Sequence, residues 1–347
     1  KESRVFYFTT CGWMMWNWLV SGLLLKSTIY LYDGSPFYPN AEVLWNFVDS
    51  EKINFMGVSA KYIDALSKEN INVIGKYKLN NLETIGSTGS PLIHESFDYI
   101  YNSVKKDVSV ASLSGGTDIV GCFIGGNPMS VVRRGEIQGP ILGMDVHVYD
   151  ENANSLKNEK GELVCIKSFP SMPLYFWNDK NNEKYHDAYF NKYENVWCHG
   201  DYILKTENNG FIIFGRSDTT LNPGGVRIGT AEIYRQVEQI EEILEGLVVG
   251  QIWQGDTRVV LFVRLIETSH LTKDLINQIK TKIREGASPR HVPTKIIAVN
   301  DIPRTKSGKI AELAVRDLIH NIQINNITAL ANPECLEEYK NIKELNF

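Results

Sequence analysis

The sequence has 347 residues, 43% of them hydrophobic and 22% charged, which is ordinary for a globular protein of about two domains. A formal net charge of −5 without a long lysine–arginine cluster excludes an extended surface for nucleic acid or anionic membranes, so small molecules are the expected partners. Its five cysteines lack the paired spacing of zinc or redox sites, which favours a reducing compartment, the cytosol.

We expect neither a signal peptide nor a membrane span near the start of the chain. The first residue is Lys1, and the first segment already has the pattern of a core strand, so an N-terminal truncation is expected. Residues 13–25 are apolar, but Asn17, Ser21 and Gly22 interrupt them, and they are fewer than the roughly 20 residues that span a bilayer. A buried helix is predicted there.

Up to about residue 113, short β-branched or aromatic runs alternate with helical stretches. This alternation indicates βαβ units on a largely parallel sheet. Strands are expected at 5–9, 28–32, 53–58, 82–87 and 108–113, and helices at 13–25, 41–51, 62–69 and 93–104.

The pattern then changes twice. From about residue 130 to 214, turn-punctuated strands at 144–149, 161–167 and 210–214 predict a smaller antiparallel barrel or sheet. After Gly215 a compact α+β domain is expected. Its helices are predicted at 230–239, 271–285 and 310–319, and its strands at 247–251, 258–264 and 294–299.

A glycine- and arginine-rich segment, residues 215–234, lies at the second of these changes. Gly224 and Gly225 permit a tight turn or a close approach of the backbone to a ligand, and Arg216 and Arg227 carry guanidinium groups that suit phosphates. Taken alone, the segment is better explained as an interdomain linker with solvated arginines.

Two other loops contain glycine next to hydroxyl groups. In residues 303–309, Lys309 follows Ser-Gly as a phosphate-binding lysine would, but the first glycine of a Walker A loop and its strand–loop–helix frame are missing. This loop is therefore not a P-loop. Residues 86–91 have no following lysine, and by themselves indicate a turn.

Two acidic positions are candidates for ligand contacts. Residues 112–118 follow a predicted buried strand, which would place Thr117 and Asp118 at its C-terminal end, where ligands of open α/β sheets collect. Asp201, after a glycine, would be able to accept hydrogen bonds from sugar hydroxyls. A turn aspartate that binds local backbone amides is an equally good explanation for either residue alone.

The joint order of these segments resembles the adenylate-forming superfamily of acyl-CoA synthetases, luciferases and peptide-synthetase adenylation domains. Four segments match in family order. They are residues 115–118, 200–201, 215–227 and 303–309. They cover nearly the whole chain. The family's Ser/Thr/Gly-rich phosphate loop is missing and is expected upstream of Lys1.

The resemblance implies an α/β adenylate-forming fold with a truncated large N-terminal domain and a small α+β lid domain. Residues 1–130 would be the C-terminal part of the large subdomains, 131–215 a β-barrel-like subdomain, 216–220 a hinge and 221–347 the mobile domain. Within the superfamily, residues 9–18, 31–36, 114–119, 288–293 and the C-terminal tail are similar to the C-terminal half of the acetoacetyl-CoA synthetase family.

Such enzymes condense a carboxylate with ATP to an acyl-adenylate and pyrophosphate, and the CoA thiol then displaces AMP. By resemblance Lys309 bridges the two reactants of the first step, Thr117 bonds the α-phosphate and Asp118 helps to hold Mg²⁺. Relatives often have glutamate at the position of Asp118, so direct and water-mediated coordination both remain open.

The resemblance also assigns binding roles around the nucleotide and CoA. They are: ribose contacts for Asp201 and Arg216, a phosphate contact for Arg227, an adenine wall for Gly89, Ser90 and Pro91, a hinge role for Asp218, a place on the pantetheine path for Gly225, and a CoA phosphate contact for Arg284. For Arg284, a solvated helix arginine is an equal alternative.

Substrate size is expected to depend on Gly115 and Trp13. Acetyl-activating relatives carry tryptophan near residues 114–116, whereas glycine here implies an acyl pocket deep enough for a four-carbon keto acid, with Trp13 as the facing wall. Trp13, Trp16 and Trp18 are alternatively plain core, which is the preferred interpretation for Trp16. No donor for the 3-keto oxygen is identifiable.

The resemblance thus implies ligation of acetoacetate to CoA with ATP and Mg²⁺, with this chain alone inactive. Apart from the resemblance, the cysteine pattern favours the cytosol, and we expect a monomer. Two alternatives remain. One is another short- or medium-chain acyl-CoA synthetase, for example for propionate or butyrate. The other is a non-catalytic nucleotide-binding fragment, which the missing phosphate loop favours.

Overall fold

The computed structural model describes residues 3–306, 308–324 and 327–346. The chain divides into two compact units. The first comprises Lys1–His199 and Ile203–Ile212, and the second comprises Gly200–Tyr202 and Ile213–Phe347.

A five-stranded parallel sheet, in the order β2-β1-β3-β4-β5, forms the centre of the first unit. Its strands are β1 (Arg4–Tyr7), β2 (Thr28–Tyr30), β3 (Phe55–Ser59), β4 (Thr84–Thr88) and β5 (Ser109–Ser112). The helices between them are α1 (Met14–Ser21), α2 (Val43–Ser50), α3 (Ala60–Lys68) and α4 (His94–Tyr99), which Ile100–Val104 continue as a π-helical turn. The predicted βαβ sheet is thereby confirmed.

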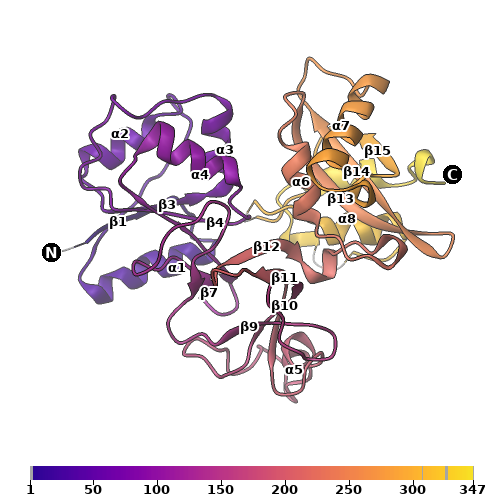
Figure 1. The fold of residues 1–347 in the computed structure, drawn as a ribbon, viewed down its shortest axis with the longest axis horizontal. Helices are drawn as coiled ribbons and strands as arrows, with labels where there is room; N and C mark the ends of the chain where they lie inside the picture. Colours follow the sequence, from indigo (N-terminus) through magenta and orange to yellow (C-terminus); the bar gives the residue numbers. More distant parts are fainter. Residues whose placement is uncertain (1–2, 307, 325–326, 347) are drawn as a thin grey trace. The chain divides into compact units, whose positions relative to one another are not determined.

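Both faces of this sheet are covered by helices. In Figure 1, α2, α3 and α4 lie on one face and α1 lies on the other. The larger core packs α2, α3 and α4 against strand residues such as Phe6, Met56 and Ile85, all fully buried. A smaller core joins Tyr7 to Met15 and Leu19 of α1. Burial on both faces explains why these strands are continuous apolar runs.

The prediction of a uniformly buried helix over residues 13–25 was wrong at its C-terminal end. After α1, a 3-10 helix (Gly22–Leu25) follows and ends at Lys26, whose φ is +57°. Leu24 and Leu25 are 87% and 82% exposed. Within the described part of the chain, no helix is sufficiently long and apolar to cross a bilayer.

Two small sheets follow. The first, in the order β6-β7-β8, is antiparallel and contains Ser114–Gly116, Gly121–Gly125 and Gly139–Pro140. The second, in the order β12-β11-β10-β9, contains β9 (Val146–Tyr149), β10 (Lys160–Cys165), β11 (Trp197–Lys205) and β12 (Phe211–Arg216). A short helix, α5 (Glu183–Tyr189), precedes β11. The antiparallel texture was predicted, but α5, β11 and the β6-β7-β8 sheet were not.

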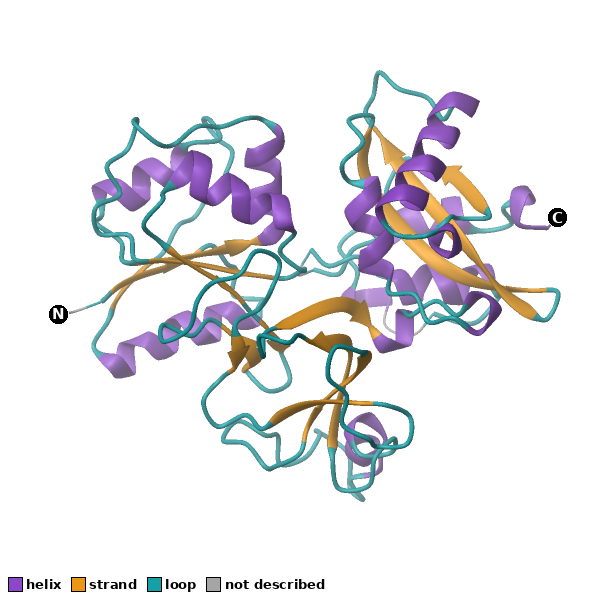
Figure 2. Cartoon of the chain, viewed as in Figure 1, coloured by secondary structure: helices purple, strands orange, loops and turns teal. Residues whose placement is uncertain are grey.

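The second unit is an α+β domain around the sheet β13-β14-β15 (Figure 2). Strands β13 (Ile243–Trp253) and β14 (Asp256–Leu265) form a hairpin whose two turn residues, Gln254 and Gly255, both have positive φ. Strand β15 (Lys295–Ala298) pairs with β14 in parallel. The helices are α6 (Thr230–Val237), α7 (Lys273–Gly286) and α8 (Glu312–Ile319).

Alternating strand residues give this sheet two cores. One face, with Val248 and Leu261, packs on α6 and α7, and the other, with Leu247 and Phe262, packs on α8 and the C-terminal 3-10 turns. Because both faces are buried, the hairpin has an almost unbroken apolar sequence. The α+β domain predicted after Gly215 is thus present.

Candidate active site

Three candidate segments of the first unit lie at the C-terminal ends of its parallel strands. Trp13 follows β1, Gly89 follows β4 and Ser114 follows β5. The Thr88 hydroxyl donates to the carbonyl of Leu113 at 2.9 Å, which joins the last two loops. A Cβ on Gly89, whose φ is +96°, would lie 4.0 Å from Trp13 Cζ2. The structure therefore brings together the predicted adenine wall and the predicted acyl wall, at the edge where open α/β sheets bind ligands.

Thr117 and Asp118 lie in the turn after β6, and both are exposed. The Asp118 carboxylate is nevertheless held, because the Tyr189 hydroxyl donates to its Oδ2 at 2.5 Å. The Tyr189 ring stacks on Trp197, with centroids 3.6 Å apart and planes 14° apart. Sequence reasoning missed Tyr189, which is 71 residues away in sequence, and no motif in the chain signals the contact.

Neither of the two glycines before Thr117 has free space for a Cβ. A Cβ on Gly115 would collide with the carbonyl of Gly121 and the Cα of Cys122, in the neighbouring strand β7. A Cβ on Gly116 would collide with Asp118 Oδ1 and lie 2.9 Å from His199 Cε1. The direction in which a side chain on Gly115 would point is thus filled by backbone, so glycine here leaves no indole-sized space by itself.

Asp201, Arg216 and Asp218 form a charged group in the second unit. Asp201 is 7% exposed in β11 and accepts a hydrogen bond from Arg216 Nη1 at 3.1 Å. Arg216 Nε lies 3.7 Å from Asp218 Oδ1. Asp201 is therefore a strand residue with an arginine partner, and the alternative of a turn aspartate that binds local amides does not describe it.

Arg227 is exposed and stacks its guanidinium over Tyr202, 5.8 Å from the ring centroid. The 3-10 turn Pro223–Gly225 lies just before Arg227. The amide of Gly224 in this turn donates to both carboxylate oxygens of Asp256, at 3.0 and 3.1 Å. The turn is thus tied to the β13–β14 hairpin. The surroundings of Gly225 lie outside what the structure describes.

Arg284 lies in the last turn of α7 and is exposed. A guanidinium in this place interacts favourably with the negative end of the helix dipole. This geometry fits the solvated helix arginine as well as a phosphate contact, and the two interpretations remain open.

Lys309 ends an exposed loop that closes on itself. The amide of Thr305 donates to the carbonyl of Lys309 at 2.8 Å, and the amide of Lys309 donates to the Thr305 hydroxyl at 3.2 Å. Ser307 lies outside the described residues. The base of the loop is fixed by the ion pair between Arg304 and Glu245, and by Asn332, whose Oδ1 accepts from the Arg304 amide at 2.8 Å.

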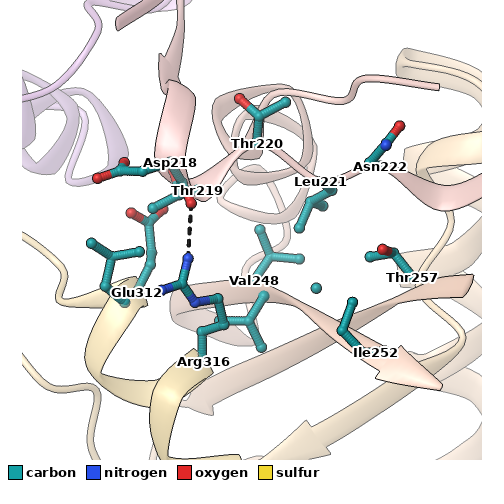
Figure 3. Close-up of a pocket in the computed structure, with 13 residues that line it drawn as sticks. Asp218, Thr219, Thr220, Leu221, Asn222, Val248, Ile252, Thr257, Glu312 and Arg316 are labelled. Atoms are coloured by element: carbon teal, nitrogen blue, oxygen red, sulfur yellow. Dashed lines mark hydrogen bonds between the residues drawn. The ribbon is translucent and has the colours of Figure 1, made fainter. Parts of the chain in front are cut away.

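A pocket of about 150 Å³ lies within the second unit beside Asp218 (Figure 3). Residues 218–222, strand β13 and helix α8 line it. Arg316 of α8 donates through Nη1 to the carbonyl of Asp218 at 3.1 Å. Burial raises the pKa of the Glu312 carboxyl, and the Tyr234 hydroxyl, which donates to Glu312 at 2.7 Å, opposes that rise.

The described residues contain no group of three or more His, Cys, Asp or Glu side chains that would hold a metal ion. Mg²⁺ usually binds one or two carboxylates together with substrate phosphates and waters. The single exposed carboxylate of Asp118 fits that mode and does not fit a site made of protein ligands alone. All five cysteines are free thiols.

No protein-family model matches the sequence. Among curated proteins, the chain is 57% identical over 342 residues to an acetoacetyl-coenzyme A synthetase of Rhizobium meliloti (strain 1021), a match that covers 99% of this chain and 53% of that protein. It is 44% identical to the acetoacetyl-CoA synthetase of Xenopus tropicalis over 343 residues, 98% of this chain and 51% of the relative. The chain spans about half the length of the curated relatives it matches.

Solved structures agree. The acetoacetyl-CoA synthetase from Streptomyces lividans superposes with a TM-score of 0.93 at 39% identity, covering 100% of this chain and 54% of that one. An anthranilate CoA ligase in complex with anthranoyl-AMP superposes with a TM-score of 0.74 at 19% identity over 91% of this chain and 59% of its own, which concerns the fold alone. The chain is thus a homologue of acetoacetyl-CoA synthetases over nearly its whole length and has the fold of the adenylate-forming enzymes.

Proposed function

We propose that the protein to which this chain belongs ligates acetoacetate to CoA, using ATP, through an acetoacetyl-adenylate, and releases AMP and pyrophosphate. The observation that supports this most is the 57% identity over 342 residues with an acetoacetyl-CoA synthetase. Because the chain spans about half of such relatives, the activity is assigned to the whole protein, and this chain alone is expected to be inactive.

In the first step a negative carboxylate attacks a negative phosphate, so catalysis consists mainly of charge compensation and alignment. Lys309 supplies the positive charge between the reactants. Thr117 donates its hydroxyl to the α-phosphate. Asp118 would help to hold Mg²⁺, which would supply positive charge against the phosphates when bound. The exposure of all three side chains supports these roles, since each must reach a ligand.

The nucleotide is bound by two sets of residues. Asp201 accepts hydrogen bonds from the ribose hydroxyls, and Arg216, already 3.1 Å from Asp201 Oδ1, provides the second ribose contact. Arg227 binds phosphate oxygens. The segment Gly89, Ser90 and Pro91 is the wall against adenine, and the positive φ of Gly89 supports a close approach of backbone to the base.

The second step requires rotation of the smaller domain, residues 221–347, about a hinge at residues 216–220. The backbone of Asp218 rotates, so that the face of the smaller domain that carries Lys309 leaves the reaction centre and the face that binds CoA takes its place. Gly225 lies on the pantetheine path, and Arg284 binds a CoA phosphate. Residues 1–130 and the β-barrel-like subdomain, residues 131–215, belong to the larger domain and do not take part in this rotation.

The acyl group is placed against Trp13, close to Gly115. The 4.0 Å separation of Trp13 from the Cβ position of Gly89 supports this, because acid and nucleotide must meet at the α-phosphate. Since backbone fills the direction of a Gly115 side chain, this glycine acts by permitting the close β6–β7 pairing. Pocket depth is then set by other walls.

The test is acetoacetate-dependent pyrophosphate release by the whole protein, with thioester formation from a chemically supplied acetoacetyl-adenylate measured in parallel. Lys309→Ala is expected to abolish the first reaction and spare the second. Lys306→Ala, in the same exposed loop, is the matched control and is expected to retain both. If both reactions survive Lys309→Ala, the role of this lysine is wrong.

Butyrate is the comparison substrate. Equal rates of pyrophosphate release with acetoacetate and butyrate would refute a keto-specific site and favour a general short-chain acyl-CoA synthetase. AMP binding without any ATP–pyrophosphate exchange would favour a non-catalytic nucleotide-binding protein. We further propose a monomer located in the cytosol, which sedimentation and cell fractionation test.

A further inference from the structure

The contact between Tyr189 and Asp118 joins two exposed parts of the first unit. Tyr189 is the last residue of α5, and its hydroxyl lies 2.5 Å from Asp118 Oδ2. A hydrogen bond from a neutral hydroxyl to an ionised carboxylate is short and strong compared with bonds between neutral groups. The contact thus restrains a carboxylate that otherwise lies in an exposed turn.

Tyr189 is itself held in place before it contacts Asp118. Its ring stacks on Trp197, which is 2% exposed in β11, and meets Phe176 and Tyr185 edge-on at 5.7 and 5.5 Å. These contacts hold the ring by one stacked and two edge-on neighbours. The ring that carries the hydroxyl to Asp118 is therefore placed by its own aromatic packing.

The other carboxylate oxygen of Asp118, Oδ1, occupies space that is open only because residue 116 is glycine. Oδ1 lies where a Cβ on Gly116 would be, so the carboxylate occupies the space above that glycine. Gly116 makes room for one oxygen, and Tyr189 fixes the other.

We propose that Tyr189 is a positioning residue for adenylate formation, which orients the Asp118 carboxylate toward the metal-bound triphosphate of ATP. This inference rests on the proposed function, because it uses the role of Asp118 in holding Mg²⁺. Tyr189 does not touch a reactant itself. Its effect is confined to the step that involves the metal-bound triphosphate.

The experiment compares Tyr189→Phe with Tyr185→Phe in the whole protein. Both replacements remove one hydroxyl from the same helix, but that of Tyr185 donates to the carbonyl of Pro173 at 2.6 Å and not to Asp118. Tyr189→Phe is expected to raise the Mg²⁺ concentration for half-maximal pyrophosphate release roughly tenfold, as loss of one charge-assisted hydrogen bond predicts. Thioester formation from supplied adenylate is expected to stay within about twofold of wild type, since that reaction does not use the triphosphate.

A second readout needs no turnover. Binding of Mn²⁺–ATP, measured by electron paramagnetic resonance without acetoacetate, is expected to weaken by a similar factor in Tyr189→Phe and in Asp118→Asn. The double variant is expected to be no weaker than Asp118→Asn alone, because the hydroxyl acts only through the carboxylate.

The outcomes separate this inference from the proposed function. Equal Mn²⁺–ATP binding by Tyr189→Phe and Tyr185→Phe, additive losses in the double variant, or no Mn²⁺–ATP binding by the wild-type protein would each overturn the positioning role. A wild-type protein that binds Mn²⁺–ATP through Asp118 and Tyr189 but releases no pyrophosphate with acetoacetate would instead refute the proposed substrate and leave the positioning role standing.

Discussion

Replacing Asn332 with alanine is expected to loosen the base of the loop that carries Lys309. The Asn332 amide makes three hydrogen bonds. Its Oδ1 accepts from the Arg304 amide at 2.8 Å, and its Nδ2 donates to Asp301 Oδ2 at 2.5 Å and to the carbonyl of Ile302 at 3.0 Å. Alanine removes all three and leaves the Arg304 amide without this acceptor.

The expected magnitude follows from these bonds. Neutral hydrogen bonds contribute about 1 kcal/mol each and a bond to a charged group about 1.5–3 kcal/mol, before water replaces the lost partners. Because Asn332 is only partly buried, water replaces much of the lost hydrogen bonding, and we expect a net loss of about 2 kcal/mol in the free energy that holds the loop. That free energy corresponds to roughly a 30-fold increase in local opening.

Hydrogen exchange measures this opening directly. The amide of Lys306 donates to Ala329, and the amide of Ala331 donates to Arg304, so these two bonds join the loop to the tail. Both amides are expected to exchange about 30-fold faster in Asn332→Ala, in line with that opening estimate, and to keep the wild-type rate in the exposed control Glu334→Ala. Unchanged exchange at both amides would refute the idea that Asn332 holds the loop.

Three further changes have defined outcomes. Gly116→Ala is expected to displace the Asp118 carboxylate and to lower pyrophosphate release at least tenfold, a cost of about 1.4 kcal/mol or more. The control Gly139→Ala, where a Cβ meets nothing within 4 Å, is expected to keep wild-type activity. Equal losses in the two variants would contradict this. Burial raises the pKa of Glu312, so the folded state binds this proton more tightly than the unfolded state. The resulting stability is fully present at a pH below the ordinary glutamate pKa and is lost as the pH rises through the raised pKa. Urea unfolding of Glu312→Gln between pH 4 and 8 is expected to lack this loss, and a pH profile identical to wild type would argue against it. Arg316→Gln removes the donor to the Asp218 carbonyl, so the 3-10 turn Ser217–Thr219 is expected to exchange faster, which mass spectrometry checks against wild type.

Much of the fold was predictable because buried sheets leave a strong pattern. All five strands of the parallel sheet were expected within about two residues of their observed bounds, since each is an apolar run between helices. The long hairpin β13–β14 was predicted too short at both ends. At the turn end, Ile252 is 64% exposed and lies beyond the apolar core that the pattern reports. At the other end Ile243 is buried in that core, and the pattern failed to report it.

Strand β11 was missed because its sequence contains a turn-like Cys-His-Gly-Asp segment. In the structure Gly200 adopts a φ of +78° inside the strand, and the chain continues through Asp201 in extended conformation. A local glycine therefore looked like a chain reversal, whereas the pairing with neighbouring strands overrode that preference. This matters for function, because β11 carries the proposed ribose-binding residue.

The motif residues were proposed from sequence, but the residues that hold them were not. Asp118 is held by Tyr189, the loop of Lys309 by Asn332 and Glu245, and the turn at Gly224 by Asp256. These supports lie on other elements and have no fixed spacing to the motifs. Sequence periodicity reports apolar burial, whereas these contacts join polar groups, one of them the buried carboxylate of Glu245, so no pattern marks them.

This arrangement accounts for the ambiguity of each motif taken alone. A loop with glycine, hydroxyl and lysine, or a turn with an exposed aspartate, has a defined function only if something fixes its side chains, since an unrestrained exposed group loses conformational entropy when it binds a ligand. In this chain the restraint comes from aromatic, amide and carboxylate groups that are distant in sequence. We therefore expect substitutions at these supports to reduce the rate of adenylate formation with little change in overall fold, which would distinguish them from core residues such as Phe6 or Phe262, whose truncation destabilises the whole unit.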